Sequence, residues 1–377
     1  MIRAMRILML SKACVVGAYQ RKLEELAALP GVELTVIVPP AWREGGTTLT
    51  LHRAYTRGYR LLVEPIWFNG RHHLHVYPTL RRRLRELRPD ILHVDEEPYN
   101  LVTAHALWLA GRLGVAALFF TWQNLLRRYP PPFNWLERFN YHAAQHAVAG
   151  NQEAAAVLKA KGYRGPVTVI PQFGIDPAVF RPAATGERGP FRIGYLGRWT
   201  APKGIDLLLR AGAGLAGDWR VEIRGGGEEG EALRQLARQL GVQDRVEFAP
   251  YVPSTEVPAY LAHLDALVLP SRTTPSWKEQ FGRVLIEAMA CQVPVVGAAS
   301  GEIPNVIGDA GLVFPEGDVE ALRGHLARLM ADSALRRELG ERGRQRVLAH
   351  YTHQRVAEAT WKVYQNMLGV NHGPELL

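Results

Sequence analysis

Two basic side chains follow a buried strand in the second half of the sequence. Arg198 ends the run Gly194–Gly197, and Lys203 comes five residues later, directly before Gly204. A helix is predicted to begin near Gly204, and helix N-termini beyond the carboxyl ends of parallel strands attract anions. Arg198 and Lys203 could therefore bind a phosphate group there. The alternative is a solvated basic loop that caps the helix.

Two carboxylates lie eight residues apart further along the chain. Glu279 precedes a helix predicted to start near Gly282, and Glu287 lies on the second turn of that helix. A carboxylate accepts two hydroxyl groups at once, so this pair could bind two points of an extended ligand. In the alternative reading Glu279 stabilises the helix start and Glu287 is a surface residue. That reading is weaker for Glu287, because a Glu inside an apolar run needs a partner or a ligand.

A glycine run, Gly225–Gly227, follows the predicted strand Val221–Arg224. Glycines there would allow a bound group to approach the backbone closely, although an ordinary strand-to-helix turn has the same composition. All three features follow strands of the second half, so their loops could converge on one edge of one sheet.

Short apolar runs alternate with helical stretches along both halves, which predicts an α/β fold with parallel sheets covered on both faces. Strands of the first half are predicted at 6–10, 34–38, 91–94, 116–120, 147–149 and 167–170. Those of the second half are predicted at 191–196, 219–224, 246–248, 266–269 and 293–297.

A Pro- and Gly-rich stretch at 181–190 is the best candidate for a linker. We therefore expect a first domain at 1–184, a second at 185–352, and a final helical segment at 353–377. With 377 residues, two domains are also the natural expectation from length.

Composition and charge narrow the class of protein. Cys14 and Cys291 are far apart in the sequence, which is typical of a reducing compartment without disulfides. The apolar run near the N-terminus is too short for a signal peptide, and no stretch approaches the ~20 apolar residues of a membrane helix, so we expect a cytoplasmic protein. The net charge of +9 suits an anionic partner such as a diphosphate, a nucleic acid or an acidic membrane.

The motifs together resemble those of the retaining GT-B glycosyltransferases called family 4, or group 1. The G-R-x(4)-K-G element matches Gly197 to Gly204, and the E-x(7)-E element matches Glu279 and Glu287, with Phe281-Gly282 between them. Further similarity lies in Ser300–Ile303 and Gly311–Phe314. The resemblance implies two doubly wound, Rossmann-like domains facing a cleft, with the last helix returning to the N-terminal domain.

The same resemblance implies a transferase that moves a hexose from a nucleoside-diphosphate sugar to an acceptor hydroxyl, in glycan or glycolipid biosynthesis. It implies catalytic roles for Arg198, Lys203 and Glu279. The residues expected to bind the donor are Gly197, Gly225, Gly227, Val252, Phe281, Gly282, Val284, Leu285 and Glu287. The donor would be a UDP- or GDP-sugar. No cofactor is expected, and no metal, because no D-x-D element follows a plausible donor-domain strand and the basic pair can neutralise a diphosphate.

The first half departs further from the family. Only Gly17 stands where a paired-glycine loop is usual, and Gln123 stands where a histidine is common. Asp95-Glu96-Glu97 could line the acceptor side or simply end a strand. Gly17, Gln123 and Asp95 are therefore the candidates for the acceptor or sugar side.

A basic helix is predicted at 81–88. It could contact an anionic membrane that carries a lipid-linked acceptor, although charge runs are more often solvated faces, here with Leu84 and Leu87 toward the core. No nucleic-acid-binding module is visible. Two other functions stay open, a sugar-nucleotide 2-epimerase on the same fold and a non-catalytic sugar-nucleotide binder.

Overall fold

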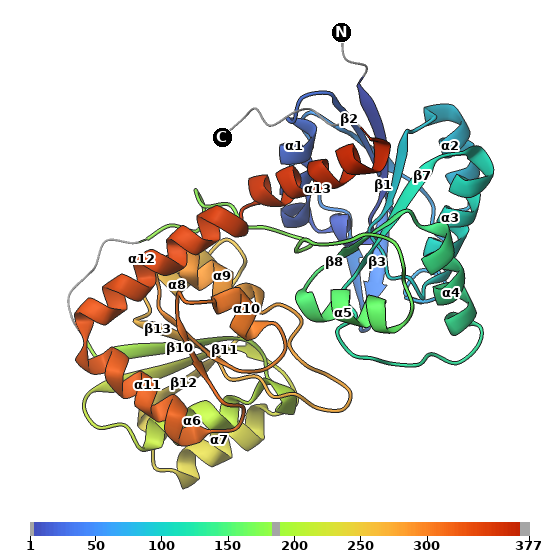
Figure 1. Cartoon of the computed structure of the whole chain (residues 1–377). Coiled ribbons are helices and arrows are strands. Elements are labelled where there is room, and N and C mark those ends of the chain that lie inside the picture. The colour runs from blue at the N-terminus through green and yellow to red at the C-terminus, as the bar shows by residue number, and fades with distance from the viewer. Residues whose placement is uncertain (1–3, 183–188, 370–377) are drawn as a thin grey trace. The chain divides into compact units, whose positions relative to one another are not determined.

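The computed structural model describes residues 4–182 and 189–369 and divides them into two compact units (Figure 1). Unit 1 comprises the chain up to Gly174 together with the C-terminal helix from His353, and unit 2 runs from Ile175 to Thr352. Most of the linker predicted at 181–190, residues 183–188, lies outside the described residues.

Unit 1 is built on a seven-stranded parallel sheet in the order β5-β2-β1-β6-β7-β8-β9. Its strands are β1 (Met5–Leu10), β2 (Val32–Val38), β5 (Arg60–Val63), β6 (Ile91–Val94), β7 (Ala116–Thr121), β8 (His146–Ala149) and β9 (Val167–Val169). A separate antiparallel hairpin consists of β3 (Ala41–Glu44) and β4 (Thr47–Thr50).

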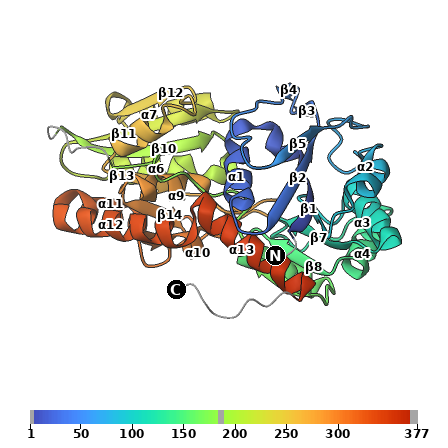
Figure 2. The same cartoon turned by 90° about the horizontal axis from the view of Figure 1, so that it is seen from above.

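Helices cover both faces of this sheet. They are α1 (Arg21–Ala27), α2 (Leu80–Leu87), α3 (Leu101–Leu113), α4 (Phe133–Ala143), α5 (Gln152–Ala160) and α13 (His353–Leu368). One core joins α2, α3, α4 and α5 to the sheet, and a second core joins α1 and α13 to the other face. Helix α13 lies beside α1 in both views, so the end of the chain completes the unit that the beginning forms (Figures 1 and 2).

Unit 2 is built on a six-stranded parallel sheet in the order β12-β11-β10-β13-β14-β15. Its strands are β10 (Phe191–Arg198), β11 (Trp219–Gly226), β12 (Val246–Ala249), β13 (Ala266–Leu269), β14 (Val295–Ala298) and β15 (Leu312–Phe314). Most of their residues are buried, as expected for parallel strands covered on both faces.

The helices of unit 2 form two layers. They are α6 (Ile205–Ala213), α7 (Gly230–Gln239), α8 (Val257–Ala262), α9 (Arg283–Ala290), α10 (Ile303–Ile307), α11 (Val319–Ala331) and α12 (Ser333–His350). Helix α6 packs beside α7 and α11, whereas α9 packs beside α8, α10 and α12. Asp318 and Asp332 cap α11 and α12 by accepting backbone N–H groups, which fixes where these two helices begin.

The predicted α/β class with two doubly wound parallel sheets is confirmed. The prediction lacked the β3–β4 hairpin, β5 and β15, and the helices α4, α5, α8 and α10. These elements give weak sequence signals because most of them are only three to six residues long. Helix α4 is longer, but it directly follows the run Pro130–Pro132, whose prolines favour a loop over a helix.

Candidate functional site

The basic element of unit 2 lies where β10 ends. Arg198 is the last residue of the strand, and a short 3-10 turn, Ala201–Lys203, leads through Gly204 into α6. Gly204 has a φ of +65°, and a Cβ atom there would lie 2.0 Å from the carbonyl oxygen of Pro270. Only glycine therefore allows this turn to pack against the chain that follows β13.

That packing brings Lys203 to Glu279. The ammonium nitrogen of Lys203 lies 2.7 Å from Oε2 of Glu279, and the hydroxyl of Ser271 donates to the same oxygen at 3.0 Å. The ring of Trp277 lies 4.8 Å from the ammonium group. Both charged side chains are largely buried, with 15% and 10% of their surface exposed, so the pair is well shielded from solvent.

The backbone of Glu279 is held by the turn that follows β14. Gly301 has a φ of +54°, and a Cβ atom there would lie 2.0 Å from the carbonyl oxygen of Glu279. The backbone N–H of Glu302 donates to that oxygen at 3.1 Å. The segment Ser300–Ile303 thus positions Glu279, which gives this part of the sequence a physical role.

Arg198 and Glu279 both influence the hydroxyl of Tyr195. The buried hydroxyl of Tyr195 donates to the carbonyl oxygen of Arg198 at 2.8 Å. Burial raises the pKa of Tyr195, the charge of Glu279 raises it further, and the charge of Arg198 lowers it. The guanidinium and the carboxylate therefore both act on one hydroxyl, and the Arg198 side chain is exposed to solvent.

Glu287 lies one turn into α9, beyond Gly282. Arg283 donates to Oε1 of Glu287 at 2.8 Å, and 12% of the Glu287 side chain is exposed. Burial raises the pKa of Glu287 above its ordinary value, and Arg283 partly offsets this rise. Glu287 thus has the partner that a glutamate in an apolar run needs, namely Arg283, four residues earlier on the same face of α9.

The glycine run at the end of β11 packs against the end of β10. A Cβ atom at Gly225 would lie 1.9 Å from the carbonyl oxygen of Gly197, and one at Gly227 would lie 2.3 Å from that of Trp199. A Cβ atom at Gly226 would meet the ring of Tyr251 at 3.4 Å. These close approaches of backbone to backbone explain why positions 225 and 227 are glycines.

The apolar residues predicted for the donor site differ in exposure. Val252, Phe281 and Val284 are half-buried at the edge of the core. The side chain of Leu285 is fully buried. Leu285 could therefore contact a ligand only through its backbone.

In unit 1, the candidates Gly17 and Gln123 lie at the ends of β1 and β7. Gly17 is buried in a 3-10 turn, and a Cβ atom there would lie 2.5 Å from Nδ1 of His52. Gln123 lies 3.5 Å from both the hydroxyl of Tyr129 and the ammonium of Lys161.

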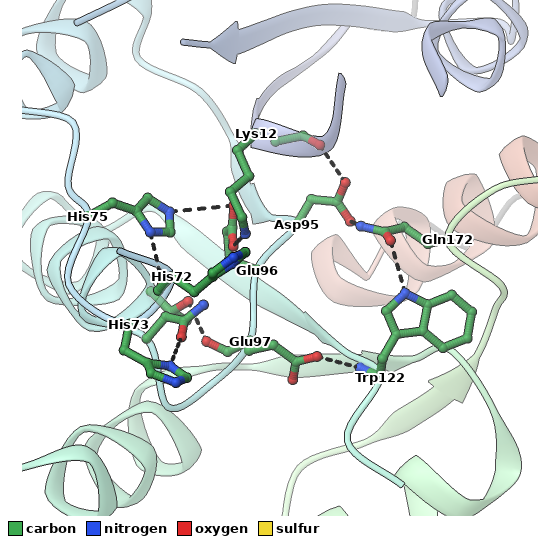
Figure 3. Close-up of polar contacts among 12 residues, drawn as sticks. Lys12, His72, His73, His75, Asp95, Glu96, Glu97, Trp122 and Gln172 are labelled. Carbon is green, nitrogen blue, oxygen red and sulfur yellow. Dashed lines mark hydrogen bonds and ion pairs between the residues drawn. The ribbon is translucent and has the colours of Figure 1, made fainter. Parts of the chain in front are cut away.

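Asp95 follows β6 and is almost completely buried. It accepts hydrogen bonds from the Ser11 hydroxyl at 2.7 Å and the Gln172 amide at 2.9 Å, and the Lys22 ammonium lies at 3.4 Å. Burial opposes ionisation, but Lys22 and these hydrogen bonds hold the pKa of Asp95 below its ordinary value. The indole of Trp122 donates to Gln172, which extends the network to the end of β7 (Figure 3).

Glu96 points to a different set of partners (Figure 3). It forms an ion pair with Lys12, and its second oxygen lies 3.6 Å from Nε2 of His75. Burial opposes ionisation here too, yet Lys12 and His75 lower the pKa of Glu96 to about 2. Asp95 and Glu96 are thus both charged and compensated inside unit 1.

The sequence assigned no role to Ser271 and Trp277 around the Lys203–Glu279 pair, and it named Glu97 only within the triplet Asp95-Glu96-Glu97 that could line the acceptor side. Ser271 belongs to the Pro-Ser dipeptide before the E-x(7)-E element, so a signal existed for it. Across residues 4–182 and 189–369, no group of three or more His, Cys, Asp or Glu side chains is arranged to hold a metal ion.

Comparison with known protein families gives two adjoining matches. The model for "Glycosyltransferase Family 4" matches residues 20–179, and the model for "Glycosyl transferases group 1" matches residues 180–346.

Two curated relatives illustrate the sequence similarity. The chain is 36% identical over 156 residues to a GDP-mannose-dependent alpha-(1-6)-phosphatidylinositol monomannoside mannosyltransferase of Mycolicibacterium smegmatis. The aligned region covers 40% of this chain and 41% of the relative. It is 33% identical over 224 residues to the lipopolysaccharide core biosynthesis mannosyltransferase LpcC of Rhizobium leguminosarum, covering 55% and 61%. The chain thus spans about two fifths and three fifths of the length of these relatives.

Solved structures share the fold across nearly the whole chain. Sucrose-phosphate synthase from Thermosynechococcus elongatus has a TM-score of 0.72 at 20% identity, covering 97% of this chain and 100% of that one. Anabaena HepE in complex with UDP has a TM-score of 0.73 at 15% identity, covering 96% and 100%. With both family models matched end to end over residues 20–346, the chain belongs to the group 1 and family 4 glycosyltransferases and has their GT-B fold of two Rossmann-like domains.

Proposed function

We propose that the protein transfers a hexose from a nucleoside-diphosphate sugar to an acceptor hydroxyl, with retention of configuration. Arg198 and Lys203 bind the diphosphate, Glu279 binds donor-sugar hydroxyls, and Glu287 binds the ribose hydroxyls. The observation that carries this proposal is the contact of 2.7 Å between Lys203 and Glu279, which joins the basic loop after β10 to the acidic loop after β13.

The chemistry explains why fixed cations are needed. When the bond between the sugar C1 and the phosphate oxygen breaks, negative charge grows on the departing diphosphate and positive charge on the sugar. Preorganised cations stabilise the departing group more than the bound donor, which lowers the barrier. Arg198 is exposed and Lys203 is already oriented by Glu279 and Trp277, so both can meet an incoming diphosphate.

The donor in this proposal is a UDP- or GDP-sugar. One relative is named as GDP-mannose-dependent, and a neighbour in fold was solved with UDP, which together make these two bases the first choices. Because Arg198 and Lys203 supply the positive charge, we propose that transfer needs no divalent metal and persists in a chelator. Complete loss of activity that added metal restores would contradict this.

The first experiment is a thermal-shift screen with UDP-, GDP- and ADP-sugars. A donor that binds the folded protein raises its melting temperature by mass action. An assay of nucleoside diphosphate release with and without acceptor then separates the alternatives. Release that depends on an acceptor supports transfer, interconversion of the donor supports a 2-epimerase, and binding without turnover supports a non-catalytic binder.

We also propose that unit 1 contacts an anionic membrane through α2 and α3. Leu80 and Leu84 of α2 are buried, whereas Arg81, Arg82 and Arg85 are exposed. The neighbouring helix α3 presents the half-exposed ring of Trp108, Leu113 and the side chain of Arg112. Exposed arginines beside an apolar ring suit anionic headgroups and the interface below them. In residues 4–182 and 189–369, no helix is long and apolar enough to span a bilayer.

Co-sedimentation with vesicles of phosphatidylglycerol and phosphatidylcholine tests this contact. Binding at low salt should weaken at least tenfold in R81E/R85E. The control R328E/R337E, two exposed arginines of unit 2, changes the net charge equally and should bind as the unmodified protein does. Equal losses in both variants, or no binding to anionic vesicles, would remove the membrane contact.

A further inference from the structure

Glu97 differs from the two acidic residues before it. Its Oε2 accepts from the Thr121 hydroxyl at 2.5 Å and its Oε1 from the backbone N–H of Trp122 at 2.8 Å. Within the described parts of the chain, no Lys, Arg or His nitrogen comes within ion-pair distance of Glu97, whereas Asp95 and Glu96 each contact a lysine. Figure 3 shows its side chain directed toward Trp122 and away from Lys12.

The environment of Glu97 makes its charge costly. Burial raises its pKa to about 7, although the Thr121 hydroxyl, the Trp122 N–H and the charge of Lys12 act in the opposite direction. A carboxylate can accept about four hydrogen bonds, and Glu97 accepts one on each oxygen, so each oxygen can accept another. A half-buried carboxylate that lacks a cation and keeps acceptor capacity is suited to hydroxyl donors.

Two tyrosine hydroxyls lie within the electrostatic range of this carboxylate. The charge of Glu97 contributes to raising the pKa of both Tyr99 and Tyr129, after burial as the main cause, and the two rings lie 4.4 Å apart. The ring of His73 lies 5.4 Å from Tyr99. Its Nδ1 lies 3.0 Å from Oδ1 of Asn100, which assigns the hydrogen to Nδ1 and leaves Nε2 as an acceptor.

The location also fits a ligand site. Glu97 follows β6, and Thr121 ends the neighbouring strand β7, so the cluster lies at the carboxyl edge of a parallel sheet. Ligands of open α/β sheets bind at this edge. Apolar rings with a few polar groups are the usual lining of such sites.

We propose that Glu97, with the rings of His73, Tyr99 and Tyr129, binds the acceptor, and that this acceptor is a neutral hydroxyl-bearing ring such as a sugar or a cyclic polyol. The proposal rests on the proposed function, because glycosyl transfer requires an acceptor hydroxyl. Hydroxyl groups donate to the Glu97 carboxylate while the rings cover the apolar face of the ligand. An anionic acceptor is disfavoured, since its charge would meet that of Glu97. Asp95, which the sequence also placed on the acceptor side, contacts Ser11, Lys22 and Gln172.

The test compares E97Q with E96Q, a neighbouring carboxylate of equal size. In E97Q an amide replaces a half-buried charge without a cationic partner, so we expect the melting temperature at pH 8 to stay the same or rise. In E96Q the half-buried Lys12 loses its ion-pair partner, so the melting temperature should fall. This comparison needs no acceptor. A fall in E97Q as large as that in E96Q would show that Glu97 is structural and overturn the proposal.

Transfer is then measured with the donor found by thermal shift and with methyl α-D-mannopyranoside, methyl α-D-glucopyranoside, N-acetylglucosamine and myo-inositol as acceptors. We expect E97Q to lower kcat/KM for the acceptor about tenfold to a hundredfold, as loss of a hydrogen bond to a charged group does. Donor-induced thermal shift in the same variant shows that unit 2 is intact. If all four compounds fail as acceptors with unmodified protein that binds the donor, or if E97Q has the same kcat/KM as the unmodified protein, the proposal is wrong. Absence of any donor binding would instead refute the proposed function.

A pH profile separates recognition by the charged group from a packing effect. The groups that act on Glu97 are the hydrogen bonds from Thr121 and Trp122 and the charges of Lys12 and Glu96, and the charge of Glu97 in turn raises the pKa values of Tyr99, Tyr129 and Tyr141. With half-ionisation near pH 7, acceptor KM in the unmodified protein should rise about tenfold from pH 8 to pH 6. It should change little in E97Q. Parallel profiles in both proteins would overturn the proposal.

Discussion

The ammonium group of Lys203 and the carboxylate of Glu279 lie 2.7 Å apart although 76 residues separate them in the sequence. The contact links the loop after β10 to the loop after β13, two strands that are neighbours in the sheet of unit 2. Each side chain therefore holds the other in place. A diphosphate that binds Lys203 would meet a cation whose position is already fixed, so little reorganisation is needed.

Removal of either cation should lower turnover. If Arg198 and Lys203 bind the departing diphosphate, R198A and K203A should each reduce kcat about a hundred- to a thousandfold. The measurement is nucleoside diphosphate release at saturating donor. Turnover within a few-fold of the unmodified protein in both variants would contradict the assignment.

The same two variants should differ in stability. Arg198 is exposed, so R198A should leave the melting temperature almost unchanged. Lys203 is largely buried against Glu279, so K203A leaves a buried carboxylate without its cation and should lower the melting temperature. Similar unfolding curves for K203A and R198A would show that the ion pair adds nothing to the fold.

Gly204 should tolerate no side chain. Its φ is +65°, and a Cβ atom would lie 2.0 Å from the carbonyl oxygen of Pro270, so G204A must displace backbone as well as strain it. Gly241 is a matched control because its φ is +70° and a Cβ atom there meets nothing within 4 Å. We expect G241A to cost about 1 kcal/mol of unfolding free energy and G204A clearly more, measured by urea denaturation. Equal losses would show that the close approach to Pro270 is relieved without cost.

Much of unit 2 could be predicted because its motifs contain glycines at positions where the local backbone allows no side chain. Gly204, Gly225 and Gly301 are each forced by close approach to another chain segment, so the residue type reveals the geometry. Strand β13 is a continuous apolar run, which makes it easy to find. The contact between Lys203 and Glu279 depends on the order of strands in the sheet, which the resemblance to a family supplied.

Unit 1 was harder to predict because its sequence does not say which carboxylate is paired. Asp95, Glu96 and Glu97 are consecutive and chemically alike, and only their partners distinguish them. Lys12 and Lys22 come from a region more than 70 residues earlier. Asp95 was chosen from this triplet, and its contacts show a buried, compensated group. Pairing over such sequence distances follows from the fold and leaves no local pattern.

The C-terminal helix should depend on one buried hydrogen bond. The hydroxyl of Tyr364 in α13 lies 2.7 Å from Nδ1 of His93 in β6, and both side chains are buried. Y364F leaves this nitrogen without its partner, so we expect a loss of about 1–2 kcal/mol and a fall of several degrees in the melting temperature. Y59F, which removes a hydroxyl bonded to the Tyr55 carbonyl at the half-buried edge of the unit, should cost less. A larger loss in Y59F would contradict this ranking.

Glu97 should make the stability of the protein depend on pH. Its pKa is raised by burial from about 4.5 in the unfolded chain to about 7 in the folded protein. A group whose pKa is higher when folded adds stability below its unfolded pKa and loses it as the pH rises through the folded value. The unmodified protein should therefore lose on the order of 2–3 kcal/mol from this group between pH 4.5 and pH 8. E97Q has no such group, so its melting temperature relative to that of the unmodified protein should rise as the pH rises. A difference that stays constant across this range would show that Glu97 keeps an ordinary pKa and is better solvated than its surroundings indicate.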